Sequence, residues 1–166
     1  MAATTVYHGA DGTITVAVES TPAGDKAKAI ADKYALTPVG RATGVTVRVT
    51  NDVKPFHELG QRFPTELRPG NMNVFGTIDR AYINGALLRL MLGDAADNRP
   101  AGTFLGPSFN LSLQVQNPND PDTTATVTVM GVQLNEWNYT LPEDDFVMEQ
   151  VSFRALWIKA EDKAKA

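Results

Sequence analysis

Apolar and polar residues alternate with a period of two along most of the chain. This period predicts β-strands that bury one face, because successive side chains on a strand point to opposite sides of the sheet. The alternating runs lie at residues 13–18, 44–50, 72–79, 109–116, 123–132 and 146–159. The sequence Asn-Pro-Asn-Asp-Pro-Asp separates the runs 109–116 and 123–132, and such a turn-forming stretch predicts that they pair as a hairpin.

The last alternating run is unusually long. Residues 146–159 span more than twice the common strand length of about 5–6 residues, and they are apolar on both faces near the ends of the run. This pattern predicts a strand that leaves its own sheet or is covered on both sides. Residues 133–145 before it begin as a strand and end in an acidic corner. Residues 160–166 predict a frayed C-terminal tail.

One strand leads directly into the one well-marked helix, which the pattern places at about 79–92. Asp79 suits the N-cap position, and Gly93 suits the position after the last turn. On a helical wheel one side is apolar throughout, but Leu88 and Leu92 lie near the centre of the other side. Either a loop of the same subunit, for which the segment 51–69 is a candidate, covers these two leucines, or a second copy of the protein covers them.

Two segments lack a regular pattern. Residues 19–43 contain either a short helix within 25–35 or a solvated loop. Residues 51–69 predict an irregular loop, because three prolines and a glycine interrupt them. Long irregular loops are often functional, and exposed apolar clusters usually mark contact surfaces. The loop carries four such residues: Phe56, Leu59, Phe63 and Leu67.

Composition narrows the class of protein. The 166 residues predict a single domain, 1–166, that is mainly β with one main helix. The absence of cysteine excludes disulfides, thiolate metal sites and a cysteine nucleophile. The net charge of −4 argues against a general nucleic-acid binder, but it leaves open a protein that encloses nucleic acid without gripping it. No apolar run approaches the ~18 residues of a membrane helix. The N-terminus resembles no signal peptide, which predicts a protein made and kept in a cytoplasm unless another machine moves it.

Candidate chemistry is nearly absent from the sequence. His57 and Glu58 are adjacent in an extended segment, so their side chains point apart, and no second histidine stands at ligand spacing. The acidic stretch 143–145 lacks the spaced oxygen ligands and the glycine of a calcium loop. Neither phosphate-binding glycine motifs nor a nucleophile elbow occurs. We therefore expect no catalytic, cofactor or metal site, and a structural homo-oligomer is favoured over an enzyme.

Two longer segments carry an ordered set of motifs. Residues 58–93 hold a loop ending in Pro-Gly, a strand of the form G-x-I-x-R, and then the helix. Residues 131–158 hold two strands joined at a Pro-Glu-Asp-Asp corner, the second of the form V-x-F-x-A. In this order they resemble the tail tube proteins of contractile-tailed bacteriophages, a family related to the inner tubes of contractile injection systems. The two segments cover a little under half of the chain.

The resemblance implies an α+β fold that is mainly β, with two packed antiparallel sheets forming a β-barrel or sandwich beside the helix. It implies hexameric rings that stack into a hollow tube in the virion, with DNA passing through an acidic lumen without specific binding. The implied partners are further copies of the chain, the sheath protein, the tape measure protein, and the baseplate and tail terminator proteins. The loop equivalent to 50–70 reaches the adjacent ring in such tubes. This makes Phe56, Leu59, Phe63 and Leu67 candidates for ring stacking, and Leu88 and Leu92 candidates for contacts within a ring.

Two other functions remain open. An inner tube of a contractile injection or secretion system shares the architecture and carries protein effectors in place of DNA. A monomeric β-sandwich module that binds carbohydrate could use exposed aromatic residues, for which the candidates are Trp137, Tyr139 and Trp157. Aromatic residues on β-patterned runs more often belong to a core or an interface.

Overall fold

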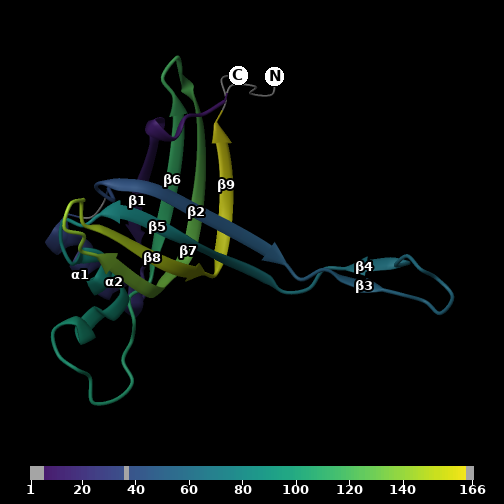
Figure 1. Cartoon of the computed structure of the whole chain (residues 1–166), viewed down its shortest axis with the longest axis horizontal. Helices are drawn as coiled ribbons and strands as arrows, with labels where there is room; N and C mark the ends of the chain where they lie inside the picture. Colours follow the sequence, from purple (N-terminus) through teal and green to yellow (C-terminus); the bar gives the residue numbers. More distant parts are fainter. Residues whose placement is uncertain (1–5, 36–37, 164–166) are drawn as a thin grey trace.

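The computed structural model describes residues 6–35 and 38–163, and its strands form two antiparallel layers. Sheet A contains β1 (Gly12–Val18), β6 (Phe109–Asn117), the first part of β7 (Asp120–Thr140) and β9 (Trp157–Lys163). Sheet B contains β2 (Ala42–Asn51), β5 (Met72–Ala81), β8 (Met148–Ala155) and the last part of β7. The strands of the two sheets run crosswise to each other (Figure 1). The predicted fold class, two packed antiparallel sheets with flanking helix, is confirmed.

The two sheets are joined where β7 passes from one to the other. Gly131 adopts φ +66° there, a conformation that residues with a Cβ rarely adopt, and the pairing of β6 with β7 shifts register at the same place. The chain between β8 and β9 crosses beside it, and the Leu156 backbone N–H donates to the Met130 carbonyl at 3.0 Å. The run 146–159 is therefore two strands in two sheets, which confirms the prediction that it leaves its own sheet.

The core contains residues from both sheets and from two helices. In the runs outside β7 the buried strand residues fall on one face of the predicted alternation: Val16, Val74, Ile78, Phe109, Leu111, Val151 and Phe153. In β7 the buried apolar residues are Val129, Val132 and Leu134, because the register shift beside Gly131 moves the buried face from odd-numbered to even-numbered positions. Helix residues complete the same cluster: Ala27, Ala31, Ala86, Leu87 and Leu90. Short alanine side chains let the helix that carries them approach the strands closely.

Helix α1 (Pro22–Tyr34) resolves the choice left open for residues 19–43. The Thr21 hydroxyl accepts a hydrogen bond from the Gly24 backbone N–H at 3.0 Å, and Pro22 occupies the first helical position. The predicted short helix within 25–35 is therefore present and begins earlier. It packs against β1 and against helix α2 (Ala86–Leu92). Short 3₁₀ turns lie at Gly9–Asp11 (η1) and Gly93–Ala96 (η2).

The predicted start of the second helix at residue 79 is wrong. Asp79 belongs to β5, where it pairs with β2 and β8, and its carboxylate accepts from the Gln150 side-chain amide at 2.7 Å. The helix begins at Ala86, whose backbone N–H donates to the Asn84 side-chain carbonyl at 3.1 Å. The predicted end is confirmed, because α2 stops at Leu92 before Gly93. Asp79 does not cap the helix as predicted, because its carboxylate is hydrogen-bonded to Gln150 on the neighbouring strand β8.

Two further boundaries differ from expectation. Residues 51–69 are not irregular, because β3 (Lys54–Phe56) and β4 (Glu66–Arg68) pair as a hairpin within them. Residues 160–163 of the predicted frayed tail belong to β9, which pairs with β7 up to Lys163. Residues 164–166 lie outside the described part of the chain.

Candidate assembly surfaces

The β3–β4 hairpin forms an arm, residues 52–71, that projects from one end of sheet B (Figure 1). Its base is closed by the Asp52 backbone N–H, which donates to the Asn71 carbonyl at 3.0 Å, and by the Gly70 N–H, which donates to the Asn51 side chain at 3.1 Å. Further out, the Thr65 N–H donates to the Phe56 carbonyl at 2.9 Å. These bonds give the arm a defined shape before it meets any partner.

The four apolar residues predicted for ring stacking all lie on this arm, and all are exposed. Leu59 is 105% exposed and Phe63 is 83% exposed, and Phe56 and Leu67 are also exposed. Large apolar side chains gathered on one projecting element usually mark a contact surface. The structure therefore brings the four candidates together, and their role in stacking stays a prediction.

Leu88 and Leu92, the candidates for contacts within a ring, are half-buried on α2. The arm cannot cover them, because it points away from both helices (Figure 1). The explanation in which segment 51–69 covers them is wrong. Helix α1 packs on α2, and a contact of the remaining leucine surface with a second copy stays a prediction.

The end of α2 is tied to the following loop by an ion pair. The Arg89 guanidinium donates to the Asp97 carboxylate at 2.8 Å. This hydrogen bond, with the attraction of the positive charge, lowers the pKa of Asp97 below its ordinary value. Asp97 is exposed and Arg89 is half-buried, so salt screens the pair in part. The pair orders the surface beside Leu92 without adding to the core.

A buried polar network that the sequence did not reveal lies where sheet B meets α2. Arg80 Nε donates to Glu149 Oε1, and both side chains are fully buried. Trp137 Nε1 donates to the other carboxylate oxygen, Glu149 Oε2, at 2.8 Å. Arg80 Nη2 donates to the Asn84 carbonyl at 3.2 Å, and the Asn84 side chain in turn begins α2. The network fixes the helix relative to three strands.

The sequence held one signal for this network. Arg80 continues the alternation of Val74, Gly76 and Ile78, so a charged residue stands on the face that the pattern assigns to the core. A charge in that position requires a partner of opposite sign. The partner, Glu149, stands 69 positions away, and nothing in the sequence alone connects the two.

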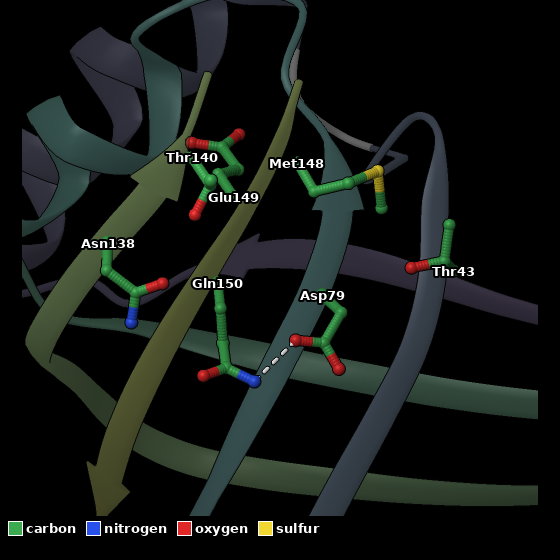
Figure 2. Close-up of a pocket in the computed structure, with 7 residues that line it drawn as sticks. All are labelled: Thr43, Asp79, Asn138, Thr140, Met148, Glu149 and Gln150. Atoms are coloured by element: carbon green, nitrogen blue, oxygen red, sulfur yellow. Dashed lines mark hydrogen bonds between the residues drawn. The ribbon is translucent and has the colours of Figure 1, made fainter. Parts of the chain in front are cut away.

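The outer face of sheet B is polar and slightly hollowed. The first hollow, about 400 Å³, is lined by Thr43, Asp79, Asn138, Thr140, Met148, Glu149 and Gln150. Figure 2 shows the hydrogen bond between Asp79 and Gln150, and it shows the Glu149 carboxylate turned away from these two residues. A second hollow follows the same strands and contains Arg48, Glu136 and Arg154. Short polar side chains in an open hollow suit contact with water.

The structure gives little support to the carbohydrate site proposed from the aromatic residues or to a metal site. Trp137 is held by Glu149 and packs against the core, so its indole is not a free platform for a sugar. Tyr139 is stacked on it, with ring centroids 4.8 Å apart, while Trp157 is exposed at the start of β9. Within residues 6–35 and 38–163, no cluster of three or more acidic or histidine side chains could hold a metal ion. No helix in that part of the chain has the length and apolarity to cross a membrane.

Two strands leave a backbone edge unpaired in sheet B. In the described part of the chain, β2 pairs only with β5, and residues 133–140 of β7 pair only with β8. In sheet A the described part of β9 likewise pairs only with β7, whereas the Val39 N–H donates to the Ile14 carbonyl at 2.9 Å and occupies part of the β1 edge. Unpaired edges are templates for pairing with another chain.

The chain matches no protein-family model and no curated protein sequence. Its fold is similar to that of several solved structures. It is similar to a chain of the sheath–tube complex of PVC, an extracellular contractile injection system, with a TM-score of 0.62 and 9% identity over 94% of this chain and 91% of that one. It is similar to the SPP1 tail tube protein, with a TM-score of 0.59 and 12% identity over 96% and 80% of the two chains.

A third similar structure is a type six secretion system protein, with a TM-score of 0.51 and 15% identity over 90% of this chain and 82% of that one. These three structures match 94%, 96% and 90% of this chain. The chain therefore has the fold of tail tube proteins.

Proposed function

We propose that the chain is the structural subunit of a phage tail tube, which assembles into hexameric rings that stack into a hollow tube inside a contractile sheath. The observation that carries this proposal is the arm, a preformed hairpin with bare apolar side chains that projects from a fold shared with tail tubes. A subunit that acted alone would gain nothing from exposing Leu59 and Phe63 to water.

Rings form through sheet B. Its two open edges, on β2 and on residues 133–140 of β7, lie at opposite sides of the sheet, so one copy can pair with the next around a closed ring. Head-to-tail contacts between identical subunits close into rings when the rotation permits, and closure removes both exposed edges of sheet B. Leu88 and Leu92 on α2 contribute a second, apolar contact within the ring.

DNA passes through the lumen, which is lined by the outer face of sheet B. On this face Arg48 and Arg154 are offset by Asp79 and Glu136, so the face carries no excess of positive charge. DNA affinity comes chiefly from contacts of lysine and arginine with phosphate, and a balanced, polar wall inside an acidic subunit holds DNA weakly. Weak contact lets DNA slide during ejection.

The tube's partners follow from this position in a virion. The sheath protein binds outside, the tape measure protein lies inside during assembly, and terminator and baseplate proteins bind the two ends. The proposal is supported by the origin of the similar chains, which come from a sheath–tube complex, a sheath/tube terminator and a baseplate. The similar chains belong to tube assemblies, which favours a structural role over an enzymatic one.

A second candidate is the inner tube of a contractile injection or secretion system that carries protein effectors. The similarity to the PVC sheath–tube complex and to a type six secretion system protein favours it. Gene neighbourhood separates the two functions. Portal, terminase and capsid genes beside the coding sequence support the phage tube. Effector genes beside it, with no portal, terminase or capsid gene, support the injection system.

The proposed function is tested by electron microscopy and mass measurement of the purified protein. We expect six-membered rings and hollow tubes from the natural sequence. Phe63→Asp should give rings without tubes, because a charge replaces an exposed apolar contact. The matched control is Gln61→Asp, which places the same charge at an already polar, exposed position of the arm. A strictly monomeric protein at high concentration would exclude the tube.

A further inference from the structure

We infer that the arm of one copy docks on an apolar patch at the opposite end of sheet B in a copy of the neighbouring ring. This end patch consists of Tyr82, Ile83, Tyr139, Leu141, Phe146 and Met148, all of which are exposed. The inference rests on the proposed stacking of rings, and it names the surface that receives the arm.

Strand register places the arm and the end patch at opposite ends of the same strands. The arm leaves β2 at Asn51 and enters β5 at Met72, and these two residues pair with each other. At the other end Met148 pairs with both Ala81 of β5 and Thr140 of β7. Strand β5 has ten residues, which at the usual rise separates the two surfaces by about 30 Å.

This separation decides which copy can occupy the patch. An arm that points away from the patch cannot fold back over the length of β5 to reach it (Figure 1). If a second copy is translated along the direction of the strands, its arm reaches the end patch of the first copy, and neither the arm nor the patch has to rotate. Such head-to-tail contact joins unlike surfaces and repeats without limit, which is the requirement for a growing stack.

Part of the end patch is held in place by the folded sheet. The rings of Tyr82 and Tyr139 lie 5.4 Å apart, and the Tyr82 backbone N–H donates to the Val147 carbonyl at 2.9 Å, beside Phe146 and Met148. Phe146 is 82% exposed and Leu141 is 69% exposed. Because Tyr139 stacks on Trp137, which Glu149 holds, the patch rests on the buried network. Tyr82 and Tyr139, which are already ordered by ring contacts, lose little side-chain entropy on binding.

Charge also matches the arm to this end of the sheet. Residues Glu143, Asp144 and Asp145 form an exposed acidic corner between Leu141 and Phe146. Arg62 stands at the exposed tip of the arm, between Leu59 and Phe63, and forms no ion pair within the described part of the chain. When apolar residues of the arm meet the end patch, this guanidinium comes to the acidic corner. The pairing fixes the register of docking.

Cysteine crosslinking tests the contact directly, since the natural chain has no cysteine. We expect the double variant Leu59→Cys/Phe146→Cys to form tubes under reducing conditions and, after oxidation, a ladder of covalent oligomers on a non-reducing gel. Neither single variant should give a ladder. The matched control is Leu59→Cys/Gln114→Cys, which places the second thiol at an exposed position on the outer face of sheet A. A ladder from the control pair alone overturns the inference.

Charge reversal provides a test that does not depend on disulfide geometry. Arg62→Glu and Asp144→Arg should each raise the protein concentration needed for tubes by about fivefold or more, and the two changes together should restore it toward the natural value. If the natural sequence forms tubes but the double variant still needs the higher protein concentration, the docking of the arm on the end patch is overturned and the proposed tube function is not. If the natural sequence forms neither rings nor tubes, both are overturned.

Discussion

Arg80 shows how one buried residue can connect the interior to a surface that we propose for assembly. Its guanidinium bonds Glu149 within sheet B and reaches the Asn84 carbonyl at the start of α2. Trp137 completes the network and supports Tyr139. The sequence places Arg80 on the buried face of a strand, yet the pairing partner is decided by which strands lie side by side, and that is a property of the folded chain.

At this scale we predict that Glu149→Gln lowers the free energy of unfolding by about 3–5 kcal/mol, because it leaves the buried Arg80 charge without a counter-charge. Urea denaturation measures the loss. Glu136→Gln is the matched control, since it makes the same change at an exposed position of the same sheet and should alter stability by less than about 0.5 kcal/mol.

A second variant separates the charge from the packing. Replacing both partners, Arg80→Met with Glu149→Leu, should recover much of the lost stability, because apolar residues of similar size remove both desolvated charges together. If Glu149→Gln unfolds at the same urea concentration as the natural protein, the pair does not hold the end of sheet B as described.

Among the elements, the arm is the one whose secondary structure the sequence pattern did not predict. The segment 51–69 reads as irregular because proline and glycine interrupt it, yet Pro55 sits in β3 opposite Leu67. A two-stranded ladder leaves one edge of each strand unpaired, so a missing N–H is tolerated there. Strict alternation located the long strands correctly. The start of α2 was misplaced because Asp79 satisfies its carboxylate on a neighbouring strand, which a sequence read in order cannot reveal.

We predict that the arm serves assembly and contributes little to folding. Replacing residues 57–65 by Asn-Gly joins Phe56 to Glu66 through a two-residue hairpin turn, which suits this pair. The midpoint of thermal unfolding should stay within about 2 °C of the natural value, because the removed residues are all exposed and surface changes away from the core shift stability little. Electron microscopy should then show rings that do not stack. Tubes of normal length from this variant would exclude the arm from stacking.

At the scale of the whole molecule, the open edges, the arm and the end patch lie on different sides of one sheet. The sequence predicted a mainly β domain with surplus apolar surface, and the structure assigns that surplus to particular places. The arm exposes the four apolar residues expected there, α2 keeps Leu88 and Leu92 half-buried, and the end patch was not foreseen as a surface. It was missed because its members come from separate segments, near 82, 140 and 147, that only the sheet brings together.

We predict that Leu88→Glu weakens ring formation while the subunit stays folded. Leu88 is only half-buried in one copy, so the change should cost an isolated subunit about 1 kcal/mol, whereas a charge within a subunit interface costs considerably more. Sedimentation measures the fraction in rings, and thermal unfolding confirms the fold. Ala101→Glu, at an exposed position, is the control. Unchanged ring formation by Leu88→Glu would show that α1 and α2 cover this face within one subunit.

The crossing beside Gly131 has a mechanical consequence. Strand β7 and the β8–β9 segment both run through both sheets and meet there, where the Leu156 N–H bonds the Met130 carbonyl. A load applied along the arm enters β5 and spreads through sheet B, and it then reaches sheet A along continuous backbone. Covalent bonds, more than side-chain packing, resist sliding of one layer over the other. A wall made of such subunits would transmit sudden axial force as a stiff body, with its two layers moving together.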